Sequence, residues 1–284
     1  PLATQVAVRP IGILQGLTAT AHPLMICPSF QEIMGRPLPE IVHALQDPDR
    51  RSRLAAEHAV AVTKLEGLAL DIFGSFHKVF PMENPVNYEP KSADSVAARA
   101  AAAGRPVIDF LIDLMCEEDG NRLLYKPLFN FSHGNLDDVR EMLLRDNAVL
   151  GLSDAGAHCG AICDGSMSTT ALALWTRDRH ESGRLPIETM VNHLTQRTAR
   201  HVGWLDRGVV APGYLADLNV IDMARLSAPP PRIVRDLPAG GRRLMQTATG
   251  YDFTIKRGVV TFANGEHTSE LPGRLVRGAQ PAPR

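Results

Sequence analysis

A chain of 284 residues is long enough for one barrel-sized domain or two smaller ones, with a sizeable hydrophobic core. Its hydrophobic share of 44% and charged share of 21% are typical of a soluble globular protein, and no apolar run reaches membrane-spanning length. With 30 basic and 31 acidic residues the net charge is -1, which argues against a nucleic-acid partner and leaves a membrane partner without support.

The first part of the chain is predicted to alternate between strands and helices. Residues 3–9 favour a buried strand, followed by a loop that opens at Gly12 and Gly16. Residues 29–70 and 92–115 are predicted to be helical, with breaks at Asp47-Pro48 and Gly104-Arg-Pro106, and residues 76–86 favour a short strand and a turn. Because the chain begins within a predicted strand region, we expect its natural start to lie upstream of Pro1.

Two further strands are predicted at residues 126–132 and 148–153, joined by a helix over residues 136–145. This order is typical of a right-handed βαβ unit, whose two strands are parallel. Residues 169–179 and 186–203 are also predicted to be helical, and Arg177, Asp178 and Arg179 are predicted to lie at a solvated helix end. The segment 1–206 is therefore predicted to be an α/β domain with helical insertions.

The character of the sequence changes at Arg207. Residues 208–222 favour strand, turn and strand, with Pro212-Gly213 in the turn. Residues 226–241 are rich in proline and glycine and predict an extended arm, and residues 255–265 favour a strand that ends in the turn dipeptide Asn264-Gly265. The segment 207–284 is thus predicted to be a small β module with an extended arm.

The run Ala148-Val-Leu-Gly-Leu-Ser-Asp154 places a carboxylate at the end of a predicted buried strand. Burying an unpaired carboxylate is costly, and barrel enzymes carry their chemistry at the carboxyl ends of strands. Asp154 is therefore a candidate general base or metal ligand, although an aspartate there also caps the helix that follows a strand.

Three other residues are candidates for substrate binding. His158 follows Asp154 after a small-residue run that would let it return to the same pocket, or it is a loop histidine without a role. His133 follows the neighbouring strand and is either a pocket residue or a helix-entry residue. Arg9 ends the first strand, where its guanidinium would clamp a substrate carboxylate or form a structural salt bridge.

The four cysteines, Cys27, Cys116, Cys159 and Cys163, are scattered along the chain, which indicates a reducing cytoplasm as the location. The pair Cys159 and Cys163 is better explained as two small packed residues than as thiolate ligands of a metal. The chain contains no His-x-His pair, no phosphate-binding glycine loop and no nucleophile elbow.

Several segments of the sequence, including the run around Asp154, resemble the metal-dependent amidohydrolase superfamily. Gly151-Leu-Ser-Asp-Ala-Gly-Ala-His158 resembles its strand-eight signature, and Asn130-Phe-Ser-His-Gly-Asn-Leu-Asp-Asp-Val-Arg140 resembles the preceding strand and helix. The segment 208–222 is similar to the superfamily's Gly…Pro-Gly…Ala-Asp β-hairpin. Segments 236–242 and 271–278 resemble the C-terminal portion of the N-acyl-D-amino-acid deacylase (D-aminoacylase)-like group.

The resemblance implies the C-terminal portion of a (β/α)8 TIM-type barrel with a small β-sandwich module at the C-terminus. It implies a zinc-dependent hydrolase of N-acyl D-amino acids, which are small-molecule substrates. Asp154 would take a proton from the attacking water, and its coordination of the metal depends on the site variant.

The sequence departs from the family pattern because the remaining metal ligands cannot be assigned. About eight strands and 250 residues make a complete barrel, and about three barrel strands are recognisable here. We therefore expect the other ligands upstream of Pro1 and expect the 284-residue piece alone to be inactive. Two alternatives stay open: a cyclic amidase of the hydantoinase or dihydroorotase kind, and a non-catalytic homologue that lost the metal.

Overall fold

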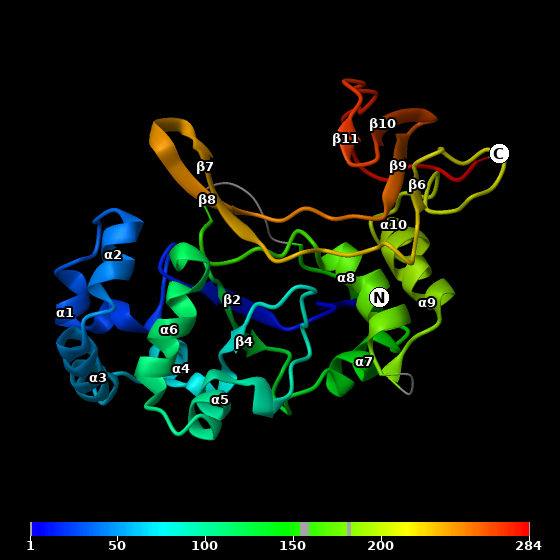
Figure 1. Cartoon of the computed structure of the whole chain (residues 1–284). Coiled ribbons are helices and arrows are strands. Elements are labelled where there is room, and N and C mark those ends of the chain that lie inside the picture. The colour runs from blue at the N-terminus through cyan, green and yellow to red at the C-terminus, as the bar shows by residue number, and fades with distance from the viewer. Residues whose placement is uncertain (1, 154–158, 181–182, 284) are drawn as a thin grey trace.

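The structure, a computed structural model, describes residues 2–153, 159–180 and 183–283 and has a mixed α/β fold (Figure 1). The helices are α1 (Pro28–Gln31), α2 (Leu38–Ala44), α3 (Pro48–Val62), α4 (Gly67–Gly74), α5 (Val96–Ala102), α6 (Val107–Gly120), α7 (Asp137–Leu143), α8 (Met167–Ala173), α9 (Ile187–Asn192) and α10 (Thr198–His201). The strands are β1 (Thr4–Val6), β2 (Ile11–Gln15), β3 (Phe80–Pro81), β4 (Leu124–Phe129), β5 (Ala148–Leu150), β6 (Leu218–Ile221), β7 (Arg232–Leu237), β8 (Gly241–Met245), β9 (Tyr251–Lys256), β10 (Val259–Ala263) and β11 (Glu266–His267).

The predicted helical regions are confirmed, including their breaks. Asp47 lies in the break between α2 and α3 and caps α3, where its carboxylate accepts a hydrogen bond from the Asp49 backbone amide at 3.0 Å. The chain also leaves the helix between α5 and α6, as the Gly104-Arg-Pro106 break predicts. Short π-helical turns, Leu174–Asp178 and His193–Arg197, extend α8 and α9. No helix of the described residues is both long and apolar enough to cross a membrane.

Strands β1 and β5 pair in parallel, with Val6 opposite Leu150, so segments far apart in sequence lie side by side. The predicted loop after residue 9 is wrong, because Ile11–Gln15 forms β2. Gly12 is needed in that strand: a Cβ there would lie 2.5 Å from the Lys126 carbonyl oxygen on β4. The glycine therefore allows close strand approach and does not open a loop.

The predicted βαβ unit is also wrong. Strand β4 is the central strand of the sheet β2-β4-β3, in which both of its neighbours run antiparallel. Both edges of β4 are thus occupied, and β5 pairs with β1 in a separate sheet. Helix α7 does connect β4 to β5, but it joins two sheets.

The C-terminal region is one four-stranded antiparallel sheet, in the order β11-β10-β9-β6, and a separate hairpin, β7-β8. The first predicted strand of segment 208–222 is absent within the described residues, and only β6 forms there. The predicted extended arm, residues 226–241, instead contributes β7 to the hairpin. The predicted turn at Asn264-Gly265 is confirmed by positive φ angles of 51° and 85°. A β-sandwich is not confirmed by this arrangement.

Three hydrophobic clusters hold these parts together. One surrounds β1, β5 and α7–α9 and contains the fully buried Trp175, whose indole nitrogen donates to the Val8 carbonyl at 2.7 Å. A second lies among the helices α1, α2, α3, α5 and α6, and a third joins β2 and β4 to Leu244 on the hairpin. The hairpin consequently reaches from the C-terminal region across β2, toward the N-terminal helices (Figure 1).

The buried histidines of this fold predict that its free energy of unfolding falls in acid. Burial lowers the pKa of His22 to about 3, and it also lowers the pKa of His58 and of His193. An unfolded histidine binds its proton near pH 6.5, so between pH 6.5 and 3 the unfolded chain binds more protons than the folded one. We expect His22 alone to reduce the free energy of unfolding by about 1.4 kcal/mol for each pH unit of acidification in that window. Urea unfolding at pH 7 and pH 5 should show a shallower pH dependence for His22→Phe than for the exposed His201→Phe. An equal pH dependence of the unfolding free energy in the two variants would contradict the lowered pKa of His22.

Candidate functional site

The carboxyl ends of the parallel strands β1 and β5 form a cavity of about 360 Å³. The Gly151 amide donates to the Val6 carbonyl at 3.1 Å, which continues the strand pairing to the cavity edge. A Cβ on Gly151 would lie 2.7 Å from the Cβ of Gln5, so this position requires glycine. The cavity lining combines apolar and hydroxyl side chains: Gln5, Val8, Leu150, Gly151, Leu152, Ser153, Met167, Ser168, Leu194 and Thr198.

The chain turns sharply as it leaves β5. Leu152 has a φ of 68°, a left-handed conformation that costs a branched side chain energy and is found often at functional sites. The Ser153 hydroxyl lies 3.5 Å from the carbonyl oxygens of Asp164 and Gly165. Asp154 follows directly and His158 comes four residues after it; both lie outside the described residues, so their predicted roles stay predictions.

The segment that comes after His158 is anchored to two other elements. The Ala161 carbonyl accepts from the Leu14 amide on β2 at 2.7 Å, and the Cys159 carbonyl accepts from the Leu244 amide on β8 at 2.9 Å. Both flanks of segment 154–158 are therefore attached to sheet strands.

Arg9 follows β1, as predicted, but its guanidinium is turned inward and only 1% of the residue is exposed. One of its nitrogens lies 3.1 Å from the Cys163 carbonyl, 3.2 Å from the Asp164 carboxylate and 3.4 Å from the Ser166 hydroxyl. The guanidinium also stacks 3.8 Å from the Tyr88 ring centroid. These contacts match the structural salt bridge, the second of the two roles that the sequence indicates for Arg9. Substrate binding by Arg9 stays a prediction.

His133 lies in the turn after β4, and its side chain is 70% exposed. Its Nδ1 is 3.1 Å from the carboxylate of Asp138 on α7. It is not among the residues that line the cavity at the strand ends, because β4 belongs to a different sheet from β5. The structure therefore does not bring His133 together with that cavity.

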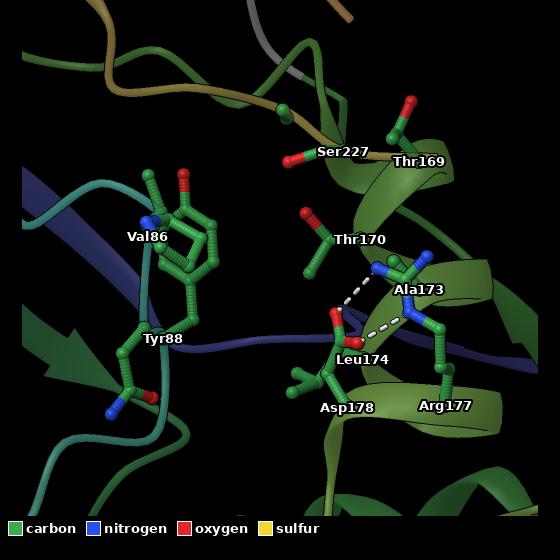
Figure 2. A pocket seen from close by; sticks show the side chains of 12 residues that line it. Val86, Tyr88, Thr169, Thr170, Ala173, Leu174, Arg177, Asp178 and Ser227 are labelled. Atoms are coloured by element: carbon green, nitrogen blue, oxygen red, sulfur yellow. Dashed lines mark hydrogen bonds and ion pairs between the residues drawn. The ribbon is translucent and has the colours of Figure 1, made fainter. Parts of the chain in front are cut away.

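A second cavity of about 360 Å³ lies beside α8. In Figure 2, Tyr88 and Val86 face Thr170 and the ion pair of Arg177 and Asp178 across it. The Arg177 guanidinium lies 3.0 Å from the Asp178 carboxylate, and it donates to the Leu226 carbonyl at 2.8 Å. The sequence predicts a solvated helix end for this pair, whereas the structure places it at the wall of a cavity.

The prediction that Arg179 lies at the same solvated helix end is wrong, because this residue is buried. Its guanidinium binds both carboxylate oxygens of Glu89 at 2.8 Å and lies 2.6 Å from the carboxylate of Asp137. It also lies 4.8 Å from the Trp175 ring centroid. The sequence spacing indicates this contact with Trp175, because residues four apart in a helix have their side chains on one face.

Across residues 2–153, 159–180 and 183–283, no group of three or more histidine, cysteine, aspartate or glutamate side chains is arranged to hold a metal ion. Burial raises the pKa of the Cys163 thiol to about 11, which disfavours the thiolate that a metal would need. The described residues alone thus do not fit a metal.

The amidohydrolase family model matches residues 4–262 of the chain. No curated protein matches the chain in sequence. Among solved structures, a D-aminoacylase described as defining a novel subset of amidohydrolases is 20% identical, with a TM-score of 0.37, over 68% of this chain and 36% of its own. A D-aminoacylase mutant in complex with CuCl2 is 18% identical, with a TM-score of 0.39, over 82% of this chain and 50% of its own. The chain therefore spans half or less of the length of these proteins.

Proposed function

This chain belongs to the amidohydrolase family, and on that premise we propose that the protein hydrolyses the amide bond of N-acyl D-amino acids. The observation that carries the proposal is the family match, which extends over residues 4–262. The D-amino-acid substrate is proposed from the sequence likeness of segments 236–242 and 271–278 to the D-aminoacylase-like group. We also propose β1 and β5, the parallel pair, as strands of the family's barrel.

Asp154 is the residue proposed to transfer the proton. It comes four residues after the end of β5 and directly after Ser153, which lines the cavity at the strand ends. In the proposed reaction a water oxygen adds to the amide carbon and Asp154 accepts the water proton. Asp154 then gives that proton to the amide nitrogen as the C–N bond breaks, which yields a carboxylate and a free amino acid.

A metal, proposed to be zinc, would polarise the amide carbonyl when bound. Asp154 is the one ligand of this metal that we propose within this sequence, and the other ligands are proposed to come from outside it. Within the described segments the chain's own contribution is the cavity wall and the anchored flanks of segment 154–158. Arg9 supports one of those flanks through its contacts to residues 163–166.

Assays of the full-length protein would test the proposed activity. We expect release of free amino acid from N-acetyl-D-leucine, a lower rate with N-acetyl-L-leucine, and no ring opening of hydantoin. Activity should fall after prolonged chelation and return when zinc is added, because the metal polarises the carbonyl that water attacks. Hydantoin turnover without deacylation would instead support the cyclic amidase, and inactivity towards all three substrates in the zinc-loaded protein would support the non-catalytic homologue.

A further inference from the structure

A cavity of about 320 Å³ lies between the N-terminal helices and the β7-β8 hairpin. The segment after β2 and the helices α1 and α2 form most of its wall, and the hairpin closes one side of it. The Arg242 guanidinium on β8 donates to the Thr18 carbonyl at 2.9 Å and so joins the two sides. Among the described residues, none lines both this cavity and the one at the ends of β1 and β5.

Two polar atoms at this cavity have no hydrogen-bond partner among the described residues. They are the His22 Nδ1 and the Thr18 hydroxyl oxygen. His22 is 2% exposed, and burial keeps its pKa far below neutral pH, so its ring is uncharged there. Unpaired buried polar atoms cost free energy, and most such atoms in proteins have a partner. A neutral imidazole with a free ring nitrogen is able to donate a hydrogen bond to a ligand oxygen.

Of the residues that the structure describes, the charged ones that line the cavity are all arginines: Arg36, Arg235 and Arg242. No acidic side chain lines it, and within the described segments none of these arginines forms an ion pair with a carboxylate. By contrast, Arg243 on the same hairpin is paired with Asp236 at 2.7 Å. The three cavity arginines therefore keep their positive charge available for a ligand.

The remaining wall is apolar and includes Leu17, Phe30 and Ile41. Phe30 packs edge-on against the His22 ring, with 4.6 Å between the ring centroids. An apolar wall favours burial of a hydrocarbon group, whereas the arginines and His22 favour an anionic oxygen. The two preferences together describe a ligand with one charged end and one apolar end.

We propose that this cavity is a binding site for a small monocarboxylate that carries an aliphatic or aromatic tail. The carboxylate would bind the guanidinium groups of Arg235 and Arg242 and accept a hydrogen bond from His22. The tail would lie against Phe30 and Ile41. The site needs no metal and does not rest on the proposed hydrolysis.

Titration calorimetry of the purified full-length protein with hexanoate tests the proposal. We expect binding with a Kd of about 1 mM or tighter. The uncharged 1-hexanol and tail-free inorganic phosphate should each bind at least about tenfold more weakly, because each lacks one half of the recognised group. Arg235→Gln and Arg242→Gln should each weaken hexanoate binding by about tenfold or more.

Arg243→Gln is the matched control, because it removes a paired arginine from the same hairpin and should leave hexanoate binding unchanged. Arg235 is exposed, so its variant is expected to fold normally, and a thermal melt would verify this. Absence of hexanoate binding, or binding that both cavity variants retain in full, would overturn the proposal. Phosphate binding as tight as hexanoate binding would overturn the assignment of the apolar wall.

Discussion

Replacing Asp154 by asparagine is expected to lower kcat/KM for N-acyl D-amino acids by about 10²–10⁴-fold. Asparagine keeps the size of the side chain but accepts no proton at neutral pH. The water that attacks the amide would then lose its base, and the departing nitrogen would lose its acid. Steady-state assays of the zinc-loaded, full-length protein measure this effect, and thermal melts would show that the variant stays folded.

Asp146→Asn provides the matched control for that experiment. Asp146 is an exposed aspartate on the other end of β5, two residues before the strand begins, so the change in charge and size is the same. It should leave kcat/KM unchanged. Zinc analysis of both variants adds a separate readout, because loss of metal from Asp154→Asn alone would identify Asp154 as a ligand. Full activity of Asp154→Asn with bound zinc would remove Asp154 from the mechanism.

Replacing Arg9 by methionine is expected to reduce the free energy of unfolding by about 3 kcal/mol. The substitution removes the buried guanidinium that contacts the carboxylate of Asp164, the Cys163 carbonyl and the Ser166 hydroxyl. Losing one partner of a buried ion pair costs far more than losing an exposed pair, because the remaining carboxylate has little access to water. Urea unfolding monitored by tryptophan fluorescence gives the change.

Arg145→Met is the comparison, since Arg145 forms an ion pair with Glu141 in which both side chains are about two-thirds exposed. Its loss should cost less than about 1 kcal/mol. A similar small cost for Arg9→Met would contradict the buried network. Activity at a temperature well below the melting point separates the two roles of Arg9, because substrate binding would raise KM, whereas a supporting role predicts that KM stays near that of the parent.

Local sequence patterns predicted most of the helices, because each depends on residues close together in the chain. The apolar stripe of residues 107–115 predicts α6, and Asp47-Pro48 marks the start of α3. Strands β1, β4 and β5 were predicted for the same reason, within a few residues of their bounds. Strand β2 was missed because Gly12 indicates a loop locally, and only the contact with β4 shows why a glycine belongs there.

Pairing partners were harder to predict, since they depend on residues distant in sequence. The βαβ prediction assumed that consecutive strands pair, but the antiparallel neighbours of β4 occupy both of its edges. Arg179 looked exposed because its sequence neighbours are charged, whereas Glu89 and Asp137, which surround it, come from distant segments. Burial and ion pairing of such residues follow from the arrangement of the whole chain.

The sequence by itself determined the family and the candidate acid, because the motifs that carry them, such as Gly151 to His158, are contiguous stretches of the chain. Only the tertiary structure decided that β1 lies beside β5, that Arg9 faces the segment after His158, and that the hairpin arginines meet His22 at one cavity. The physical reason is that hydrogen bonds and ion pairs act over a few ångströms of space. Residues more than a hundred positions apart in the chain come within that distance only once the chain has folded.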